Sequence, residues 1–200
     1  MSALPQFDHP TETDYMAFER QSDEKHEFIN GEIVAMSGAS LAHIRISVNL
    51  ANLLDNALTG TGCEVFNADM RVKIAAATSY TYPDASVTCD EPSLLPDDNA
   101  ATLLNPPVIV EVLSPSTANF DRTTKFDLYQ QIPSLRDYVL VVQEKPQIDC
   151  YSRGKNNTWL LKRVTGMDAS ITIPSLSRSL ALRDVYSRVS FDEPTTPNTG

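Results

Sequence analysis

One short run of apolar and β-branched residues, Pro107-Val-Ile-Val-Glu-Val-Leu113, constrains the fold of this 200-residue chain most strongly. Runs of this kind are typical of a central strand that is covered on both faces. Glu111 interrupts the run, and a buried carboxylate without a partner costs several kcal/mol or takes up a proton. We therefore expect a metal ion or a cationic side chain beside Glu111. The alternatives are a hydrogen bond to neighbouring backbone, or a place at a strand end that faces water.

The remaining patterns predict an α/β (α+β) protein with a mixed central sheet and helices on its faces. Thr11-Glu-Thr-Asp14 is a capping box that begins a short helix ending near Arg20, and Asn30-Gly31 predicts a hairpin within residues 25–36. An amphipathic helix is predicted over residues 39–58. Its apolar positions follow steps of three and four residues: Leu41, Ile44, Val48, Ala51, Leu54 and Leu58.

Further along the chain, a second long helix is predicted over residues 121–132, where Pro133 ends it. Strands are predicted over residues 69–74, 80–89, 138–142, 148–153 and 158–163, with a polar loop over 92–107. We expect residues 1–190 to form one domain. Residues 191–200 are rich in Pro, Thr and Asn and are predicted to be a disordered tail.

Composition narrows the class of function and the compartment. The formal net charge of −10 argues against a protein that coats nucleic acid, because affinity for phosphates comes largely from clustered Lys and Arg. An enzyme that binds DNA briefly can still be acidic. Cys63, Cys89 and Cys150 are widely spaced and form no Cys-x-x-Cys pair, so we predict no disulfide framework, no zinc site and a reducing, cytoplasmic location. No secretory signal and no membrane-spanning apolar run is found.

Two further residues are candidates to form a site with Glu111. Asp84 follows a proline in Tyr82-Pro-Asp-Ala-Ser-Val87, a pairing that is most often a turn. With Glu111 on a later strand, it would offer the oxygen ligands that Mg²⁺ or Mn²⁺ prefers. Lys125 lies on the apolar face of the helix over 121–132 and so points towards the sheet. The alternative for this lysine is a packed stem whose ammonium reaches water.

Several blocks of the sequence, taken in order, resemble the Uma-two family, bacterial restriction-endonuclease-like proteins that are abundant in cyanobacteria. The blocks are Tyr82-Pro-Asp-Ala-Ser-Val87, Pro106-Pro-Val-Ile-Val-Glu-Val-Leu-Ser-Pro-Ser-Thr117, Asp121-Arg-Thr-Thr-Lys125, Tyr129 and Leu135-Arg-Asp-Tyr-Val-Leu-Val141, preceded by Phe28-Ile-Asn-Gly-Glu-Ile33, Met36 and His43. The likeness runs from about Tyr15 to Arg153. Its most specific block is Glu-Val-Leu-Ser-Pro-Ser-Thr.

The resemblance implies the PD-(D/E)XK or restriction-endonuclease-like fold, in which acidic residues lie on two central strands of a mixed sheet. Asp84 then corresponds to the motif aspartate and Glu111 to the second acid, both as metal ligands. The lysine expected two residues after the second acid is replaced by Leu113, and Lys125 is the expected substitute. Residues predicted to support the site are Glu27 and His43, whereas Ser114 and Tyr129 are expected to shape the loop and pack the helix.

The resulting hypothesis is Mg²⁺- or Mn²⁺-dependent hydrolysis of phosphodiester bonds in DNA. Asp84 and Glu111 would hold the ion, and Lys125 would orient water or stabilise charge on the phosphate. A homodimer would be the usual way to cut two strands. The basic residues predicted to contact the DNA backbone are Arg71, Lys73 and Arg122.

Two alternatives stay open. The first is a catalytically inactive protein of the same fold that serves as a binding or interaction module, which the acidity and the missing in-line lysine favour. The second is a metal-dependent hydrolase of a small phosphoester, which a closed pocket rather than an open groove would indicate.

Overall fold

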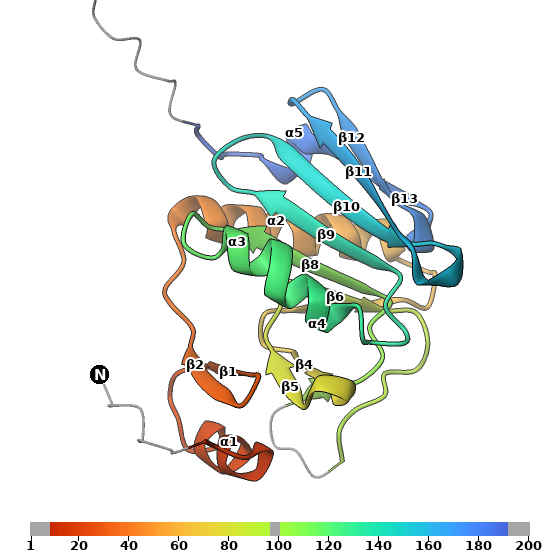
Figure 1. The fold of residues 1–200 in the computed structure, drawn as a ribbon. Helices are drawn as coiled ribbons and strands as arrows, with labels where there is room; N and C mark the ends of the chain where they lie inside the picture. The colour runs from red at the N-terminus through yellow and green to blue at the C-terminus, as the bar shows by residue number, and fades with distance from the viewer. Residues whose placement is uncertain (1–8, 97–100, 192–200) are drawn as a thin grey trace, which may run out of the picture.

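The structure, a computed structural model, describes residues 9–96 and 101–191, and Figure 1 shows their arrangement. Its largest sheet is mixed: β8 and β9 are parallel and the other neighbours are antiparallel. In spatial order this sheet contains β11 (Trp159–Thr165), β10 (Gln147–Arg153), β9 (Asp137–Val142), β8 (Val108–Leu113), β6 (Ala85–Thr88) and β3 (Glu64–Asn67). The predicted central strand, β8, is buried along its whole length.

A second sheet contains the N-terminal hairpin. Its order is β2 (Glu32–Ala35), β1 (His26–Ile29), β5 (Ser79–Thr81), β4 (Arg71–Ile74) and β7 (Thr102–Leu103). The hairpin turns at Asn30 and Gly31, whose φ values of 52° and 82° lie in the left-handed region that these two residues tolerate. A separate hairpin, β12 (Ser170–Ile173) and β13 (Arg178–Ala181), follows near the C-terminal end.

Helices cover both faces of the large sheet, as the sequence predicts. α2 (Leu41–Leu58) lies on one face, and the helical segment made of α3 (Ala118–Phe120), a π-helical turn η2 (Asp121–Lys125) and α4 (Phe126–Tyr129) lies on the other (Figure 1). α1 (Glu12–Glu19) begins at the predicted Thr11–Asp14 capping box. The remaining helices are α5 (Leu182–Val185) and three short 3₁₀ turns, η1 (Ala75–Ala77), η3 (Lys155–Asn157) and η4 (Pro174–Leu176).

The alternation of β8 side chains divides the core into two layers. Val108, Val110 and Val112 pack with α2, whereas Ile109 and Leu113 pack with the helical segment on the opposite face. Glu111 has the same parity as Ile109 and Leu113, so its carboxylate enters the layer beneath α4. The predicted mixed sheet with helices on both faces is confirmed. Among the described residues no helix is both long and apolar enough to span a membrane.

The predicted strand over residues 80–89 is wrong as a single element. The chain forms β5 and β6 in two different sheets, because Pro83 has no N–H to continue a ladder. This break places Asp84 at the entrance to β6. Among the described elements, the sequence analysis did not predict β3, β7, β12, β13 and α5, which are short and carry little periodicity. The predicted disordered tail lies outside the described residues, except for residue 191.

The face of α2 that enters the core was predicted only in part. The buried residues are Ile46, Leu50, Leu54 and Leu58, at steps of four. Leu41, Ile44 and Val48, which were placed on the core face, are 61%, 49% and 54% exposed. Both stripes have helical spacing, and periodicity alone does not decide which stripe faces the sheet.

The expectation that the cysteines form no disulfide is also wrong. Cys63 and Cys89 are bonded to each other, whereas Cys150 is free and buried. The bonded pair flanks the antiparallel ladder between β3 and β6, in which Glu64 faces Thr88. Because β3 was not predicted, the 26-residue separation gave no sign that the two thiols meet.

Candidate active site

Asp84 and Glu111 lie side by side because of the register between two neighbouring strands. β6 pairs antiparallel with β8 and Ala85 faces Val110, so the next step along the ladder brings Asp84 beside Glu111. The Asp84 Oδ2 atom also accepts a hydrogen bond of 2.7 Å from the backbone N–H of Val112. The structure therefore brings together the two acids that the sequence singled out.

The second oxygen of Asp84 is held from α2. Oδ1 lies 2.6 Å from His43 Nε2 and accepts a hydrogen bond of 3.2 Å from Ser47 Oγ. His43 and Ser47 are one helical turn apart, so both reach the same carboxylate. The side chains of His43 and Asp84 are 19% and 14% exposed, which makes this the open side of the site. His43, a predicted supporting residue, thus contacts the predicted motif aspartate directly.

Glu111 is enclosed on its other side by α4. Its Oε1 atom accepts hydrogen bonds from Lys125 Nζ at 3.1 Å and from the Tyr129 hydroxyl at 2.8 Å. Thr81 Oγ1 lies 3.0 Å from the Tyr129 oxygen. Because Tyr129 has one hydroxyl proton and gives it to Glu111, the Thr81 hydroxyl must donate to Tyr129. Tyr129 was expected only to pack the helix, but its hydroxyl belongs to the site.

The electrostatic state of Glu111 is unusual. Burial raises its pKa to about 8; Lys125 opposes this shift, while Asp121, Asp84 and Glu27 add to it. A carboxylate in such surroundings either takes up a proton near neutral pH or meets a further positive charge. The hydrogen bonds from Lys125 and Tyr129 both go to Oε1 of Glu111, so Oε2 is the oxygen that could serve as a ligand.

Lys125 lies at the centre of the cluster. Its Nζ is 2.9 Å from Glu27 Oε1, 3.1 Å from Glu111 Oε1 and 3.7 Å from Asp121 Oδ1. Burial lowers the pKa of Lys125, but the three carboxylates, led by Glu111, outweigh burial and hold the pKa well above its usual value. The ammonium therefore stays charged. The predicted orientation of Lys125 towards the sheet is confirmed, and it does not reach water as a surface lysine would.

Glu27 and Asp121 complete the shell around the lysine. Glu27, on β1, also accepts a hydrogen bond of 3.2 Å from the backbone N–H of Tyr82. Asp121 is 3% exposed and precedes Lys125 by four residues on the π-helical turn. Such turns often occur at functional sites. Asp121 was missed in the sequence, although its i, i+4 spacing from Lys125 could have revealed it.

The charge balance favours a further cation. Three carboxylates lie around the Lys125 ammonium, and Asp84 lies beside one of them, Glu111. If all four acids are ionised and His43 is neutral, the cluster has an excess of three formal negative charges. Within the ranges that the structure describes, no group of three or more His, Cys, Asp or Glu side chains is arranged as a ready metal site. Mg²⁺ commonly uses only one or two protein carboxylates and fills its shell with water and phosphate. Asp84 and Glu111 fit that requirement.

The basic residues predicted to contact DNA behave differently. Arg71 is 1% exposed and its guanidinium packs over the rings of Tyr15 and Tyr80, so a direct phosphate contact by Arg71 is wrong. Lys73 pairs with Glu12 at 2.6 Å. Arg122 pairs with the buried Asp149, also at 2.6 Å, and keeps about a quarter of its side chain exposed.

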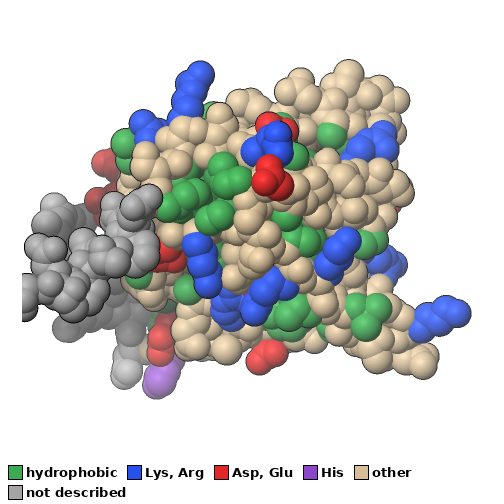
Figure 2. Space-filling view, turned by 90° about the horizontal axis from the view of Figure 1, so that it is seen from above, with side chains coloured by type: hydrophobic (Ala, Val, Ile, Leu, Met, Phe, Trp, Pro, Cys, Tyr) green, Lys and Arg blue, Asp and Glu red, His purple; other side chains and the backbone are tan. Residues whose placement is uncertain are grey.

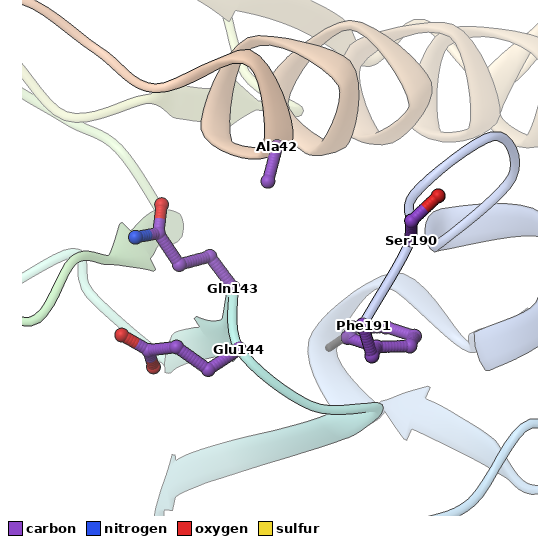
Figure 3. A pocket seen from close by; sticks show the side chains of 5 residues that line it. All are labelled: Ala42, Gln143, Glu144, Ser190 and Phe191. Atoms are coloured by element: carbon purple, nitrogen blue, oxygen red, sulfur yellow. The ribbon is translucent and has the colours of Figure 1, made fainter. Parts of the chain in front are cut away.

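A hollow of about 370 Å³ lies beside the first turn of α2 and does not coincide with this cluster. Figure 3 shows its lining, Ala42, Gln143, Glu144, Ser190 and Phe191. The lining contains one carboxylate and no lysine, arginine or histidine. A site for a small phosphoester would need a positive group to bind the phosphate, and this lining provides none.

The fold and the cluster of two strand-borne acids with a buried lysine define the chain as a restriction-endonuclease-like protein. Its structure aligns with the crystal structure of "a putative nuclease belonging to DUF820" from Anabaena variabilis ATCC 29413, at a TM-score of 0.73 and 17% identity, over 89% of this chain and 98% of that one. At this identity the likeness shows the fold alone.

The family follows from the sequence comparison. Residues 13–183 match the model of the Uma2 family, described as "Putative restriction endonuclease", and the chain belongs to this family. Two Synechocystis relatives are described as uncharacterized proteins. One, slr1290, is 39% identical over 89% of this chain and 92% of its own length; the other, sll1609, is 40% identical over 80% and 90%. The predicted family resemblance is confirmed.

Proposed function

We propose that this protein is a Mg²⁺- or Mn²⁺-dependent endonuclease that hydrolyses phosphodiester bonds in DNA. The observation that carries the proposal is the buried Glu111 carboxylate. It lies beside Asp84 and Lys125, its pKa is raised to about 8, and Oε2 is the oxygen that could serve as a ligand. Family membership and fold support nuclease chemistry in general, and the divalent cation and the DNA substrate are the parts that we add.

Asp84 and Glu111 would hold the ion, with Glu111 Oε2 and the remaining lone pairs of Asp84 as donors. A divalent cation bound there supplies charge that polarises the scissile phosphate and lowers the pKa of a bound water. His43 and Ser47 fix the Asp84 carboxylate from α2, and Tyr129 fixes Glu111. Lys125 supplies a permanent positive charge for the phosphate or the attacking water.

Charge distribution supports a nucleic-acid substrate despite the net charge of −10. Residues 122–191 contain eleven Lys and Arg against six Asp and Glu, a formal charge of +5, so the remainder of the chain carries −15. Figure 2 shows basic side chains spread over the face above the C-terminal strands, with fewer acidic ones among them. Non-specific affinity for DNA comes from such phosphate contacts. The predicted homodimer stays a prediction that sedimentation velocity would test.

A cleavage assay tests the proposal. Supercoiled, linear and single-stranded DNA would be incubated with the protein and Mn²⁺ or Mg²⁺. We expect the wild type to cleave at least one of these substrates, and Lys125→Met to lose cleavage while it still binds Mn²⁺. Lys25→Met is the matched control, because Lys25 forms a surface ion pair with Asp69 away from Glu111. Cleavage by Lys125→Met at the wild-type rate would remove Lys125 from the mechanism.

The inactive-module alternative has one supporting observation of its own. The Lys125 ammonium already neutralises part of the acidic cluster, as a purely structural lysine would. If this alternative holds, the folded wild type binds no Mn²⁺, and Glu111→Ala is neutral or stabilising because a buried charge disappears. Mn²⁺ binding by the wild type that Glu111→Ala abolishes would establish the carboxylate site and contradict this alternative's prediction.

A further inference from the structure

The ammonium of Lys125 and a divalent cation at the proposed site need the same carboxylate. Lys125 Nζ lies 3.1 Å from Glu111 Oε1, and Glu111 is also a proposed ligand of the ion. Two positive charges that share one buried carboxylate repel each other strongly, because the surroundings screen them far less than bulk water does. Binding of the ion must therefore either tolerate this repulsion or move the ammonium.

The chain offers a second place for the ammonium. Asp121 precedes Lys125 by four residues on the same helical segment, and its Oδ1 lies 3.7 Å from Nζ. This separation is within the range of an ion pair but longer than a hydrogen bond. A lysine has a flexible four-carbon stem, so rotation of the side chain alone can shorten it. Asp121 is 3% exposed and has no proposed contact with the ion or the substrate.

We propose that Asp121 is a positioning residue that receives the Lys125 ammonium when a divalent cation binds Asp84 and Glu111. Lys125 is then shared by Glu27 and Glu111 without the ion and pairs with Asp121 in its presence. The Lys125 ammonium leaves Glu111 only when the cation has bound. The ammonium and the cation, the two positive charges proposed to act on the phosphate, are therefore in place together. This inference rests on the proposed function, and it adds the competition and the role of Asp121.

Mn²⁺ binding measured by calorimetry at pH 7.5 tests the inference without any nuclease substrate. The proteins compared are the wild type, Lys125→Met, Asp121→Asn and the double variant, with Lys25→Met as control and urea unfolding to establish that each is folded. We expect Lys125→Met to bind Mn²⁺ about tenfold more tightly, since the competing charge is gone. Asp121→Asn should bind about tenfold more weakly in the wild-type background. In the Lys125→Met background, Asp121→Asn should have little further effect.

Each other outcome overturns the inference. Equal or weaker binding by Lys125→Met would show that the lysine does not compete with the ion. An equal loss from Asp121→Asn in both backgrounds would make Asp121 a ligand or a structural residue, independent of Lys125. In both cases Mn²⁺ binding by the wild type would leave the proposed function in place. If no folded protein of the set bound Mn²⁺, the inference and the metal-dependent function would fail together.

Discussion

Two buried clusters of charged side chains, one around Glu111 and one around Asp149, differ in the balance of positive and negative charge. Asp149 is fully buried and accepts hydrogen bonds from Arg122 at 2.6 Å and from Arg163 at 2.6 and 2.9 Å, so two cations meet one anion. Around Lys125, one cation meets three anions, and a fourth acid, Asp84, lies beside Glu111. In a structural ion cluster the negative charges are balanced by positive partners. In the cluster around Glu111, negative charges are in excess.

The pKa shifts of Asp149 and Glu111 differ in the same way. Burial raises the pKa of Asp149, but hydrogen bonds from Arg163 and Arg122 outweigh burial and hold the pKa below its usual value. For Glu111, burial outweighs Lys125 and the pKa is raised to about 8. Acids whose pKa is strongly raised, as for Glu111, are frequent at functional sites. Acids whose pKa is lowered by cationic partners, as for Asp149, are frequent in structural ion pairs. This contrast supports our proposal that the cluster around Glu111 is functional and that the cluster around Asp149 is structural.

The largest expected effect is on stability as a function of pH. Glu111 has a folded-state pKa above its ordinary value of 4.5, so the folded protein binds the extra proton. This contribution is fully present below about pH 4.5 and is lost as pH rises through about 8, by up to about 4 kcal/mol. Asp121, whose pKa burial also raises, adds to the trend. Urea unfolding without metal at pH 5, 6.5 and 8 measures it.

Glu111→Gln is the control for this pH dependence, because it removes the titrating group and should flatten most of the slope. Asp149 cannot contribute in this range: its pKa is lowered, so its stabilisation is present above its ordinary value of 3.8 and is lost only as pH falls through the lower folded value. A wild-type stability that does not fall between pH 5 and pH 8 would contradict the raised pKa of Glu111.

The second prediction compares neutralisation of the two acids at pH 7.5. Asp149→Asn leaves Arg122 and Arg163 without their shared carboxylate and should lower the free energy of unfolding by about 3 kcal/mol. Glu111→Gln should leave stability unchanged or raise it, because the free-energy cost of protonating or burying this carboxylate at pH 7.5 disappears. Urea denaturation of both variants makes the measurement. A Glu111→Gln protein as destabilised as Asp149→Asn would contradict the contrast between the two clusters, because it would mean that Lys125 and Tyr129 already satisfy Glu111.

A smaller effect is expected from Tyr129→Phe. Loss of the 2.8 Å hydrogen bond to Glu111 Oε1 should cost about 1 kcal/mol of stability at pH 7.5. Because that bond stabilises the ionised carboxylate, its loss should also move the pH-dependent fall in stability to higher pH. Tyr151→Phe is the matched control, since Glu111 accepts its hydrogen bonds from Lys125 and Tyr129, whereas the Tyr151 ring packs on Phe126 and Tyr138. Identical pH profiles for Tyr129→Phe and the control would exclude the effect on Glu111.

The smallest effect is expected at Arg163. Its side chain is half exposed, and Asp149 keeps the hydrogen bond from Arg122 when Arg163 is replaced. Arg163→Ala should therefore lower the free energy of unfolding by less than about 1 kcal/mol, in the range of a partly solvated ion pair. Thermal unfolding at low and high salt would measure it. A loss equal to that of Asp149→Asn would show that Arg122 alone does not satisfy the buried acid.

The contrast also explains how much of the site the sequence could predict. Glu111 was found because a carboxylate within Val108-Ile-Val-Glu-Val-Leu113 is an exception to a strong local pattern. Lys125 was found for the same reason, as a charge on an apolar helical face. The Asp149 cluster gave no such signal, because its arginines come from a helix and from a neighbouring strand. Local exceptions can be read from one sequence, whereas pairings between distant segments cannot.

The same limit accounts for the errors in the fold. The central strands and both long helices follow from periodicity, and they position the site. The choice between the two apolar stripes of α2, the disulfide of Cys63 and the hydrogen bond from Tyr129 to Glu111 all depend on which segments meet. Asp121 is the instructive case, since its spacing from Lys125 is local but becomes meaningful only once Lys125 is known to be buried.

Calorimetric titration of Mn²⁺ into the wild type and Glu111→Gln is the most direct test of the claim that the uncompensated cluster is a cation site. It requires no knowledge of the DNA sequence or structure that the protein recognises. The account predicts saturable binding by the wild type and at least about 100-fold weaker binding by Glu111→Gln, with both proteins folded. Folded Asp149→Asn should bind Mn²⁺ as the wild type does. The absence of Mn²⁺ binding by the folded wild type would contradict the account.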